Sequence, residues 1–285
     1  MTQLHEANAD QAASWGGRSG QHWTERQEHM DRQLAPVGAA VFDGVEITTG
    51  MRAIDIGCGC GDTTLELARR VGPTGRVFGL DISAPMLARA RERTPKGAPV
   101  EFVQGDATIY AFPPGAADLL FSRFGVMFFA DPALAFANIR KGMRRGGRVA
   151  FACWREAAIN PSLTIAAQEV YKFVPRPAET PPPDAPGPFA FAQEARVRDI
   201  LGKAGFAQIG VRAVDVDLDV AAGGGLDAAV ENALEIGPAS RAIDGQPPEI
   251  FERAAAAIRT AYAPYAKGNA VLIPAAIWIV TATNP

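Results

Sequence analysis

A glycine-rich loop near residue 57 holds the residues best suited to chemistry in this sequence. The stretch AIDIGCGCGDTT, residues 53–64, follows an apolar run and leads into a helix-like run. Glycine alternates with cysteine at five loop positions: Gly57, Cys58, Gly59, Cys60 and Gly61. Because glycine has no Cβ, the backbone of such a loop can approach a ligand closely. Loops of this kind between a strand and a helix bind nucleotide-like molecules, and we expect one here.

The spacing of the glycines separates two candidate ligands. A dinucleotide fingerprint requires Gly-x-Gly-x-x-Gly, but Asp62 stands where the third glycine is needed and would repel a pyrophosphate. S-adenosylmethionine carries no phosphate and ends in an ammonium and a carboxylate. Asp55, at the end of the first strand, can face the ammonium directly or through water, and the helix N-terminus at Thr63 favours the carboxylate by roughly 0.3–1 kcal/mol. The loop therefore favours S-adenosylmethionine over a nicotinamide dinucleotide.

Acidic residues also follow the next two predicted strands. Asp81 comes about twenty residues after the loop, where a carboxylate can accept hydrogen bonds from both ribose hydroxyls. Asp106, in QGDA, is placed to receive the adenine amino group. A strand-end aspartate is often only a turn or cap residue, but three on successive strands favour a binding site. Further expected contacts are Ile82 and Met86 on the two sides of the adenine, the Ala107 N–H on a ring nitrogen, and the Ser122 carbonyl on the ammonium. We also place Trp23, Gly105, Arg123 and Phe124 in this cofactor pocket.

Alternating strand-like and helix-like runs from Met51 to Trp154 would position these residues. Strands joined by single helices pair in parallel, so we expect an α/β fold with a doubly wound, mostly parallel, seven-stranded sheet, Rossmann-like, with helical cap insertions. Thr63 and Glu66 predict a capping box at the first helix. The expected segments are an N-terminal helical lid (1–45, with a helix over 22–42), an S-adenosylmethionine-binding α/β core (46–155), a proline-rich insertion (156–190), a helix and strand completing the sheet (191–221), a helical cap insertion (222–268) and a final edge strand (269–285), for which Pro274 is the sign.

These motifs resemble, in order and spacing, those of class I S-adenosylmethionine-dependent methyltransferases. The matching stretches are DIGCGCGDTT, VFGLDISAPML, VQGDA, ADLLFSRFGVMFF and RRGGRVAFACW, over roughly residues 50–155. The ubiquinone/menaquinone-biosynthesis-like branch, which acts on small molecules, is the most similar. The resemblance implies that S-adenosyl-L-methionine is the cofactor, S-adenosyl-L-homocysteine the product, and Asp55, Gly57, Gly59, Asp81, Asp106 and Ser122 the pocket residues. Cys60 departs from the pattern, since many relatives have a small residue or threonine there.

The implied reaction is direct in-line displacement of the methyl group by a small-molecule acceptor. Two alternatives stay open: a protein that binds S-adenosylmethionine without catalysis, and a nicotinamide-dependent oxidoreductase, which the loop spacing disfavours. Positioning two reactants supplies most of the rate, so a general base is needed only for a protonated nucleophile. The oligomeric state is left open.

The segments outside the core suggest a cover and an acceptor site. Trp15 and Trp23 could dock a helical lid over the cofactor, with His22 as the candidate base; the alternative is a surface helix with exposed histidines. Apolar residues of 155–190 and 222–268 could form the wall of a largely apolar acceptor pocket or simply pack on the sheet: Phe173, Phe189, Phe191, Leu234, Ile236, Phe251 and Tyr262. Arg123 could pair with Asp118 or another loop acid, or face an acidic acceptor.

Composition excludes several function classes. The 285 residues carry a net charge of −3, which offers no global attraction for nucleic acid. No apolar run reaches the roughly 18 residues of a membrane span, and the N-terminus shows no signal-peptide pattern. The three cysteines, Cys58, Cys60 and Cys153, form no disulfide framework, so we expect a reducing cytoplasm. We expect them to pack rather than to bind a ligand, and we expect no metal.

Overall fold

The computed structural model describes residues 4–177 and 182–285, and a twisted sheet forms its centre. The sheet runs in the order β3-β2-β1-β4-β5-β8-β6, and β7 pairs with β8 outside that path. Strands β1 to β5 pair in parallel, while β8 is antiparallel to both β5 and β6. The strands are β1 (Arg52–Ile56), β2 (Arg76–Asp81), β3 (Val100–Gln104), β4 (Ala117–Arg123), β5 (Met143–Trp154), β6 (Ala207–Asp219), β7 (Ala266–Lys267) and β8 (Ala270–Thr283). The expected mostly parallel, doubly wound sheet is confirmed.

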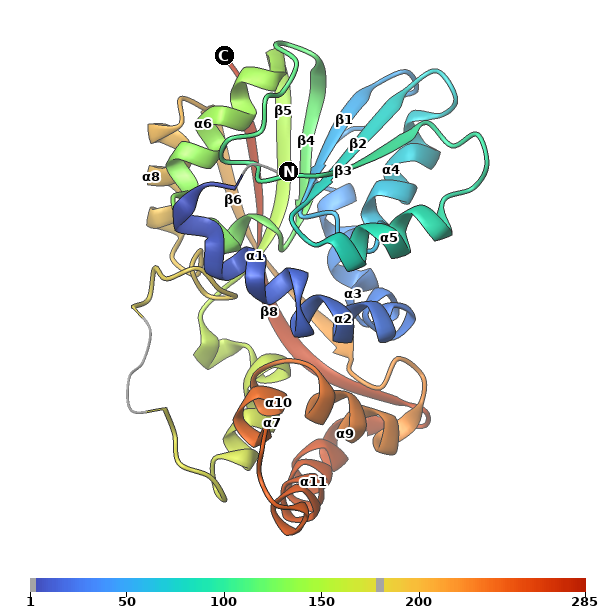
Figure 1. Cartoon of the computed structure of the whole chain (residues 1–285), viewed down its shortest axis with the longest axis vertical. Coiled ribbons are helices and arrows are strands. Elements are labelled where there is room, and N and C mark those ends of the chain that lie inside the picture. The colour runs from blue at the N-terminus through green and yellow to red at the C-terminus, as the bar shows by residue number, and fades with distance from the viewer. Residues whose placement is uncertain (1–3, 178–181) are drawn as a thin grey trace.

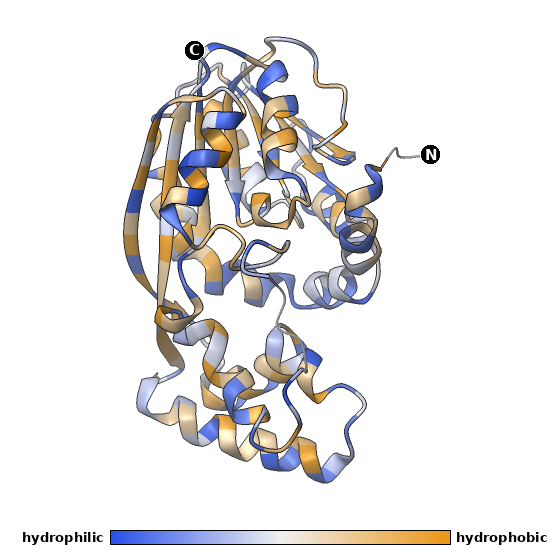
Figure 2. Cartoon of the chain, turned by 90° about the vertical axis from the view of Figure 1, so that its left-hand side faces the viewer, coloured by the Kyte–Doolittle hydropathy of each residue, from blue (hydrophilic) through white to orange (hydrophobic). Residues whose placement is uncertain are grey.

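Helices flank the sheet and join its strands (Figure 1). Helix α4 packs on β1 and β2, α5 on β3, α6 on β5 and α8 on β6. The bounds are α4 (Asp62–Val71), α5 (Ala84–Arg93), α6 (Pro132–Gly142) and α8 (Glu194–Lys203). Apolar residues concentrate along the strands and on the helix faces toward them (Figure 2). Since β1, β2, β3 and β4 run in one direction, their carboxyl ends meet at a single edge, where a ligand of such a sheet binds.

The final strand is not an edge strand, so that prediction is wrong. Strand β8 lies between β5 and β6. Its pairing with β5 begins only at Ile277, opposite Trp154, whereas Pro274 is opposite Asp217 of β6. Proline cannot donate to a ladder, and it is tolerated here because this half of β8 has β6 as its only sheet neighbour along the main path. Pro274 is therefore consistent with an edge position only for the first half of β8, before its pairing with β5 begins at Ile277.

The N-terminal segment is helical, as expected, but it is more divided. The structure has η1 (Glu6–Asn8), α1 (Ala9–Gly16), α2 (Arg18–Glu25) and α3 (Gln27–Phe42). The helix predicted over 22–42 is interrupted at Arg26, which has φ −99° and ψ 17°. Helix α3 buries Met30, Leu34 and Val37 and contacts β4, β5, β6 and β8. The earlier helices lie between the sheet and the helices at the other end of the molecule (Figure 1).

Those remaining helices form a cap. It consists of α7 (Pro161–Val170), α9 (Gly225–Glu235), α10 (Pro238–Ile243) and α11 (Pro248–Tyr262), with short 3₁₀ turns η2 (Val126–Phe128), η3 (Ala157–Ile159) and η4 (Ala263–Tyr265) elsewhere. Helix α7 contacts both α10 and α11. Helices α9, α10 and α11 fall within the helical cap insertion predicted over 222–268, whereas α7 falls within the predicted proline-rich insertion and was not expected. Part of the proline-rich run, residues 178–181, lies outside the described residues.

Candidate functional site

A cavity of about 610 Å³ lies where the sheet edge, the N-terminal helices and the cap meet. Such a volume is typical of small-molecule sites. The strand-end loops contribute Gly57, Asp81, Ile82, Gly105, Asp106, Ala107, Arg123 and Phe124; the N-terminal helices contribute Asn8, Trp15, His22, Trp23, Met30 and Leu34; the cap contributes Leu163, Ala166, Ala229, Ala233, Ile236, Arg241 and Tyr262. The cavity is thus polar along the strand ends, while its cap side combines these apolar residues with the polar residues Ser162, Asn232, Glu235, Ser240 and Asp244.

The glycine loop is built by close backbone approaches that only glycine permits. Gly57 has φ +66°, and a Cβ there would lie 2.6 Å from Gly125 Cα. Gly59 has φ +54°, and its Cβ would lie 2.8 Å from Met86 Cε. A side chain at Gly57 would therefore displace the backbone of Gly125, and one at Gly59 would displace the end of the Met86 side chain. This geometry explains the glycine pattern physically.

The predicted capping box at α4 does not form. Helix α4 begins at Asp62 behind Gly61, which adopts the left-handed conformation with φ 85° and makes no side-chain cap. Thr63 Oγ1 instead donates to Asp55 Oδ2 at 2.7 Å, and Glu66 pairs with Arg69 and Arg70. The Thr63 hydroxyl thus bonds Asp55 rather than a backbone N–H of α4. This hydrogen bond is favoured because the Asp55 carboxylate is buried and would otherwise lack a donor.

Asp55 is a buried carboxylate with one oxygen left over. Thr63 and Thr64 both donate to Oδ2 at 2.7 Å, whereas Oδ1 is buried without a partner. Burial raises the pKa of Asp55 to about 6, although both threonine hydrogen bonds oppose the rise. Asp55 lies behind the cavity wall rather than on it. An unpartnered carboxylate oxygen beside the glycine loop fits a cationic group such as the ammonium of S-adenosylmethionine, reached through water.

Asp81 faces the cavity with its carboxylate fixed by backbone donors. The Gly59 N–H donates to Oδ2 at 2.8 Å and the Ser83 N–H donates to Oδ1 at 2.8 Å. Burial raises the pKa of Asp81, against the effect of these hydrogen bonds. A carboxylate has about four acceptor sites, so each oxygen can still accept one ribose hydroxyl. The expected ribose contact fits this geometry.

Asp106 is more heavily engaged than its expected adenine contact suggests. Its carboxylate accepts from the His5 N–H at 3.0 Å, the Asn8 amide at 2.8 Å and the Thr108 N–H at 2.9 Å. Asn8 also reaches Thr108 Oγ1 and accepts from the Ala130 N–H, both at 3.0 Å. The N-terminal segment therefore takes up most of the acceptor capacity of Asp106. No sequence signal identified Asn8, since a lone asparagine in a polar segment carries no pattern.

The structure brings most of the predicted residues to one cavity. Those that line it are His22, Trp23, Gly57, Asp81, Ile82, Met86, Gly105, Asp106, Ala107, Arg123 and Phe124. Six lie behind the wall: Asp55, Cys58, Gly59, Gly61, Thr63 and Ser122. The Ser122 hydroxyl donates to the Ile56 carbonyl at 2.7 Å, so this side chain supports the first strand end. The carbonyl contact expected for Ser122 stays a prediction.

Aromatic rings form much of the wall between these polar residues and the cap. Trp15 packs edge-on against Trp23 and Phe128, with ring centroids 5.9 and 5.3 Å apart. Phe124 stacks on Trp154 with centroids 4.0 Å apart. Phe124 also has φ 67°, a strained conformation for a non-glycine residue that is typical of functional sites. Flat aromatic surfaces of this kind suit a planar, largely apolar ligand.

Of the cap residues expected in the pocket wall, only some reach it. Phe189, Ile236 and Tyr262 line the cavity. The others pack in or against the core: Phe173, Phe191, Leu234 and Phe251. Three of these residues thus line the cavity and four pack in or against the core; the acceptor wall stays a prediction for the first three.

His22 projects from α2 to the cavity, and its ring is held from the cap. His22 Nδ1 lies 3.1 Å from the carbonyl oxygen of Glu235, at the end of α9. A carbonyl only accepts, so the hydrogen is on Nδ1 and Nε2 carries the lone pair. The other histidine with a carbonyl partner, His29, bonds Val220 at 3.0 Å, and burial lowers its pKa. Of these two, only His22 lines the cavity.

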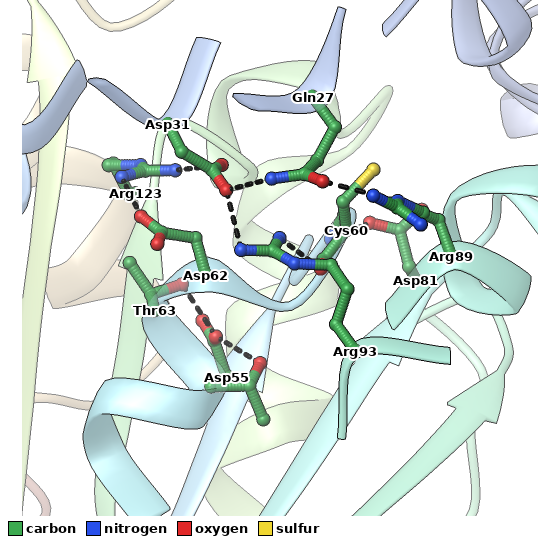
Figure 3. Close-up of polar contacts among 12 residues, drawn as sticks. Gln27, Asp31, Asp55, Cys60, Asp62, Thr63, Asp81, Arg89, Arg93 and Arg123 are labelled. Atoms are coloured by element: carbon green, nitrogen blue, oxygen red, sulfur yellow. Dashed lines mark hydrogen bonds and ion pairs between the residues drawn. The ribbon is translucent and has the colours of Figure 1, made fainter. Parts of the chain in front are cut away.

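Arg123 belongs to a polar network that joins α3 to the glycine loop. Its guanidinium bonds Asp62 at 2.7 Å and lies 4.0 Å from Asp31, and Asp31 also pairs with Arg93 at 2.7 Å. Figure 3 shows Asp31 between the two arginines. The predicted pairing with Asp118 is wrong, because Asp118 pairs with Arg144 across the far end of β4; the alternative, another loop acid, is confirmed. Arg123 is therefore already compensated.

The three cysteines behave as apolar residues. All are free and buried, and burial raises the pKa of Cys58, Cys153 and Cys60, the last to about 11. Metal binding and redox chemistry need thiolates, which burial disfavours. Within the described ranges, no group of three His, Cys, Asp or Glu side chains could hold a metal ion. In the same ranges, no helix combines the length and hydropathy that crossing a bilayer requires.

Comparison with known proteins identifies the core. Residues 53–147 match the family described as "Methyltransferase domain". The 2-phytyl-1,4-naphtoquinone methyltransferase of Thermosynechococcus vestitus is 39% identical over 122 residues, which are 43% of this chain and 52% of that protein. The aklanonic acid methyltransferase DauC of Streptomyces sp. (strain C5) is 36% identical over 120 residues, 41% of this chain and 54% of that protein. Residues 53–147 of the chain therefore contain a methyltransferase domain.

The fold likeness extends beyond that domain. The phosphoethanolamine N-methyltransferase 2 of Haemonchus contortus, solved with phosphomonomethylethanolamine and S-adenosylhomocysteine, superposes with a TM-score of 0.54 at 20% identity, over 88% of this chain and 53% of that one. At this identity the likeness concerns the fold alone. The chain spans about half the length of these curated relatives.

Proposed function

We propose that this protein transfers the methyl group of S-adenosyl-L-methionine to a small, planar, largely apolar acceptor. The main support for this proposal is the cavity of about 610 Å³. The strand-end acids and the glycine loop form one side of it, and aromatic rings and cap helices form the other. Quinone-type relatives support a small-molecule acceptor. The three reduced, buried thiols favour a reducing compartment such as the cytoplasm.

The chain's residues would hold the cofactor in a defined orientation. Asp81 would accept the ribose hydroxyls, Ile82 and Met86 would pack on the adenine, and Asp55 would neutralise the ammonium through water. When bound, the cofactor supplies a methyl group on a sulfonium that is already an activated leaving group. The protein then needs to align the acceptor and to exclude water, a positioning effect worth up to roughly 7–11 kcal/mol.

The N-terminal helices and His22 would complete the site. Trp15 and Trp23 cover the cavity from the solvent side, and Asn8 fastens this lid to Asp106. With Nδ1–H bonded to the Glu235 carbonyl, His22 Nε2 is free to take the proton of an acceptor hydroxyl or amine. His22 would thus be the general base.

A cofactor-binding protein without catalysis would need a blocked acceptor site. A cavity of about 610 Å³ that continues from the strand ends into the cap disfavours that alternative. The cap helices are more simply explained as the acceptor wall.

Two measurements test the function. Calorimetric titration should give binding of S-adenosylhomocysteine and none of NAD, and Asp81→Ala should weaken the former by about 1.5–3 kcal/mol, the value of hydrogen bonds to a charged group. Asp217→Ala, the same change on the exposed face of β6, is the matched control. Incubation with radiolabelled S-adenosylmethionine and a metabolite extract should label a small molecule; binding without any labelling would leave the scaffold function instead.

A further inference from the structure

The charges that line the cavity are nearly all compensated. Arg18 pairs with Asp244, and Arg26, from outside the cavity wall, pairs with both Glu235 and Glu231. Arg123 pairs with Asp62. The strand-end acids Asp81 and Asp106 accept backbone or amide N–H groups, as described above. These lining groups therefore need no charged ligand to satisfy them.

Arg241 is the exception. It lies in α10 of the cap and lines the cavity. Within residues 4–177 and 182–285, the structure gives its guanidinium no ion pair and no hydrogen bond. The side chain is exposed, yet the surrounding protein lowers its pKa by desolvation. The exposure and the lowered pKa are both explained if the guanidinium lies in the cavity, where its surface is accessible but largely surrounded by protein.

The neighbours of Arg241 do not supply a negative charge. The acidic side chain that acts on the pKa of Arg241 is Tyr171, at the C-terminal cap of α7, and it is a phenol rather than a carboxylate. Asp244, three residues along the chain, is committed to Arg18. A planar guanidinium without a partner matches a carboxylate, to which it can donate two parallel hydrogen bonds.

We propose that Arg241 binds a carboxylate of the acceptor and so selects planar, apolar molecules that carry one acidic group. This inference rests on the proposed function and names the class of its acceptor. The sequence had suggested Arg123 as a residue that could face an acidic acceptor. Because Arg123 already pairs with Asp62, we assign the binding of the acidic group to Arg241 of the cap instead. The carboxylate would bind at the cap end of the cavity, away from the glycine loop.

A matched pair of probes tests the proposal. The wild-type protein, saturated with S-adenosylhomocysteine, is titrated calorimetrically with 3-hydroxy-2-naphthoate and with its uncharged analogue 3-hydroxy-2-naphthamide. A charge-assisted pair predicts that the carboxylate binds about ten- to a hundredfold more tightly. Arg241→Gln should abolish this preference by weakening the naphthoate alone, and Arg241→Lys should keep part of it.

Arg253→Gln is the control, because it removes one positive charge from α11 of the same cap outside the cavity lining. It should leave the preference intact. Equal binding of the two probes, binding of neither, or a preference that survives in Arg241→Gln would overturn the proposal. The binding of S-adenosylhomocysteine is measured separately, so a failure of the cofactor site is distinguished from a failure of Arg241.

Discussion

His22 and Glu235 connect two segments 213 residues apart: His22 Nδ1 lies 3.1 Å from the Glu235 carbonyl oxygen across the cavity wall. The contact ties α2 of the N-terminal lid to the end of α9 in the cap. It also sets the tautomer of the ring, so that one nitrogen is structural and the other is available for chemistry. The lid and the cap thus meet at the candidate base.

Replacing His22 separates these two roles. His22→Asn keeps an N–H donor for the Glu235 carbonyl but removes the basic nitrogen, and His22→Ala removes both. If the ring is the base, both variants should lose at least about tenfold in kcat at saturating cofactor. Turnover of the wild type and of both variants is measured at saturating cofactor and acceptor. Restored turnover in His22→Asn would show that the ring acts only as a tether; His29→Gln is the control.

Asp55 should make the stability depend on pH. Its folded-state pKa of about 6 exceeds the ordinary value of 3.8, so the folded protein holds this proton more firmly than the unfolded chain does. That contribution is complete below about pH 4 and is lost as the pH rises through about 6. Relative to Asp55→Asn, the wild type should therefore lose on the order of 2–3 kcal/mol of unfolding free energy between pH 4 and pH 7.5. Urea denaturation at both pH values measures this, and a constant difference would contradict it.

Two glycines with the same backbone handedness should respond differently to substitution. Gly57 has φ +66° and a Cβ there would clash with Gly125, whereas Gly97 has φ +82° with open space around it. Gly97→Ala should cost about 1 kcal/mol from backbone strain alone, and Gly57→Ala at least about 2 kcal/mol. Only Gly57→Ala should also weaken S-adenosylhomocysteine binding. Thermal unfolding and calorimetry provide the two readouts, and similar losses in both variants would argue against the crowded loop.

Asn8 should hold the lid closed over the adenine side of the cavity. Asn8→Ala removes its hydrogen bonds to Asp106, Thr108 and Ala130, leaving a buried carboxylate short of a donor at a cost of about 1–3 kcal/mol. Limited proteolysis should then cut the N-terminal segment faster while the core resists. Asp10→Ala, an exposed change in α1, should digest like the wild type. Equal protection in both variants would mean that the tryptophans alone secure the lid.

The local pattern of the sequence was sufficient for the α/β core and its cofactor edge. Strands β1 to β5 alternate with helices at predictable spacing, and parallel strands must bring Asp81 and Asp106 to the same edge. The capping box at Thr63 failed because a long-range partner, the buried Asp55, outcompeted the local one.

The tertiary structure alone decided the rest of the site. Whether β8 is an edge or an interior strand depends on the pairing of residues far apart in sequence, which Pro274 cannot report. Arg123 pairs with Asp62 at the start of α4, and the packing of α3 brings Asp31, from a region without a motif, to 4.0 Å from the same guanidinium. The same holds for Arg241 and His22: both are ordinary residues of short helices, and only the docking of lid and cap around one cavity leaves one cation uncompensated and one imidazole nitrogen free.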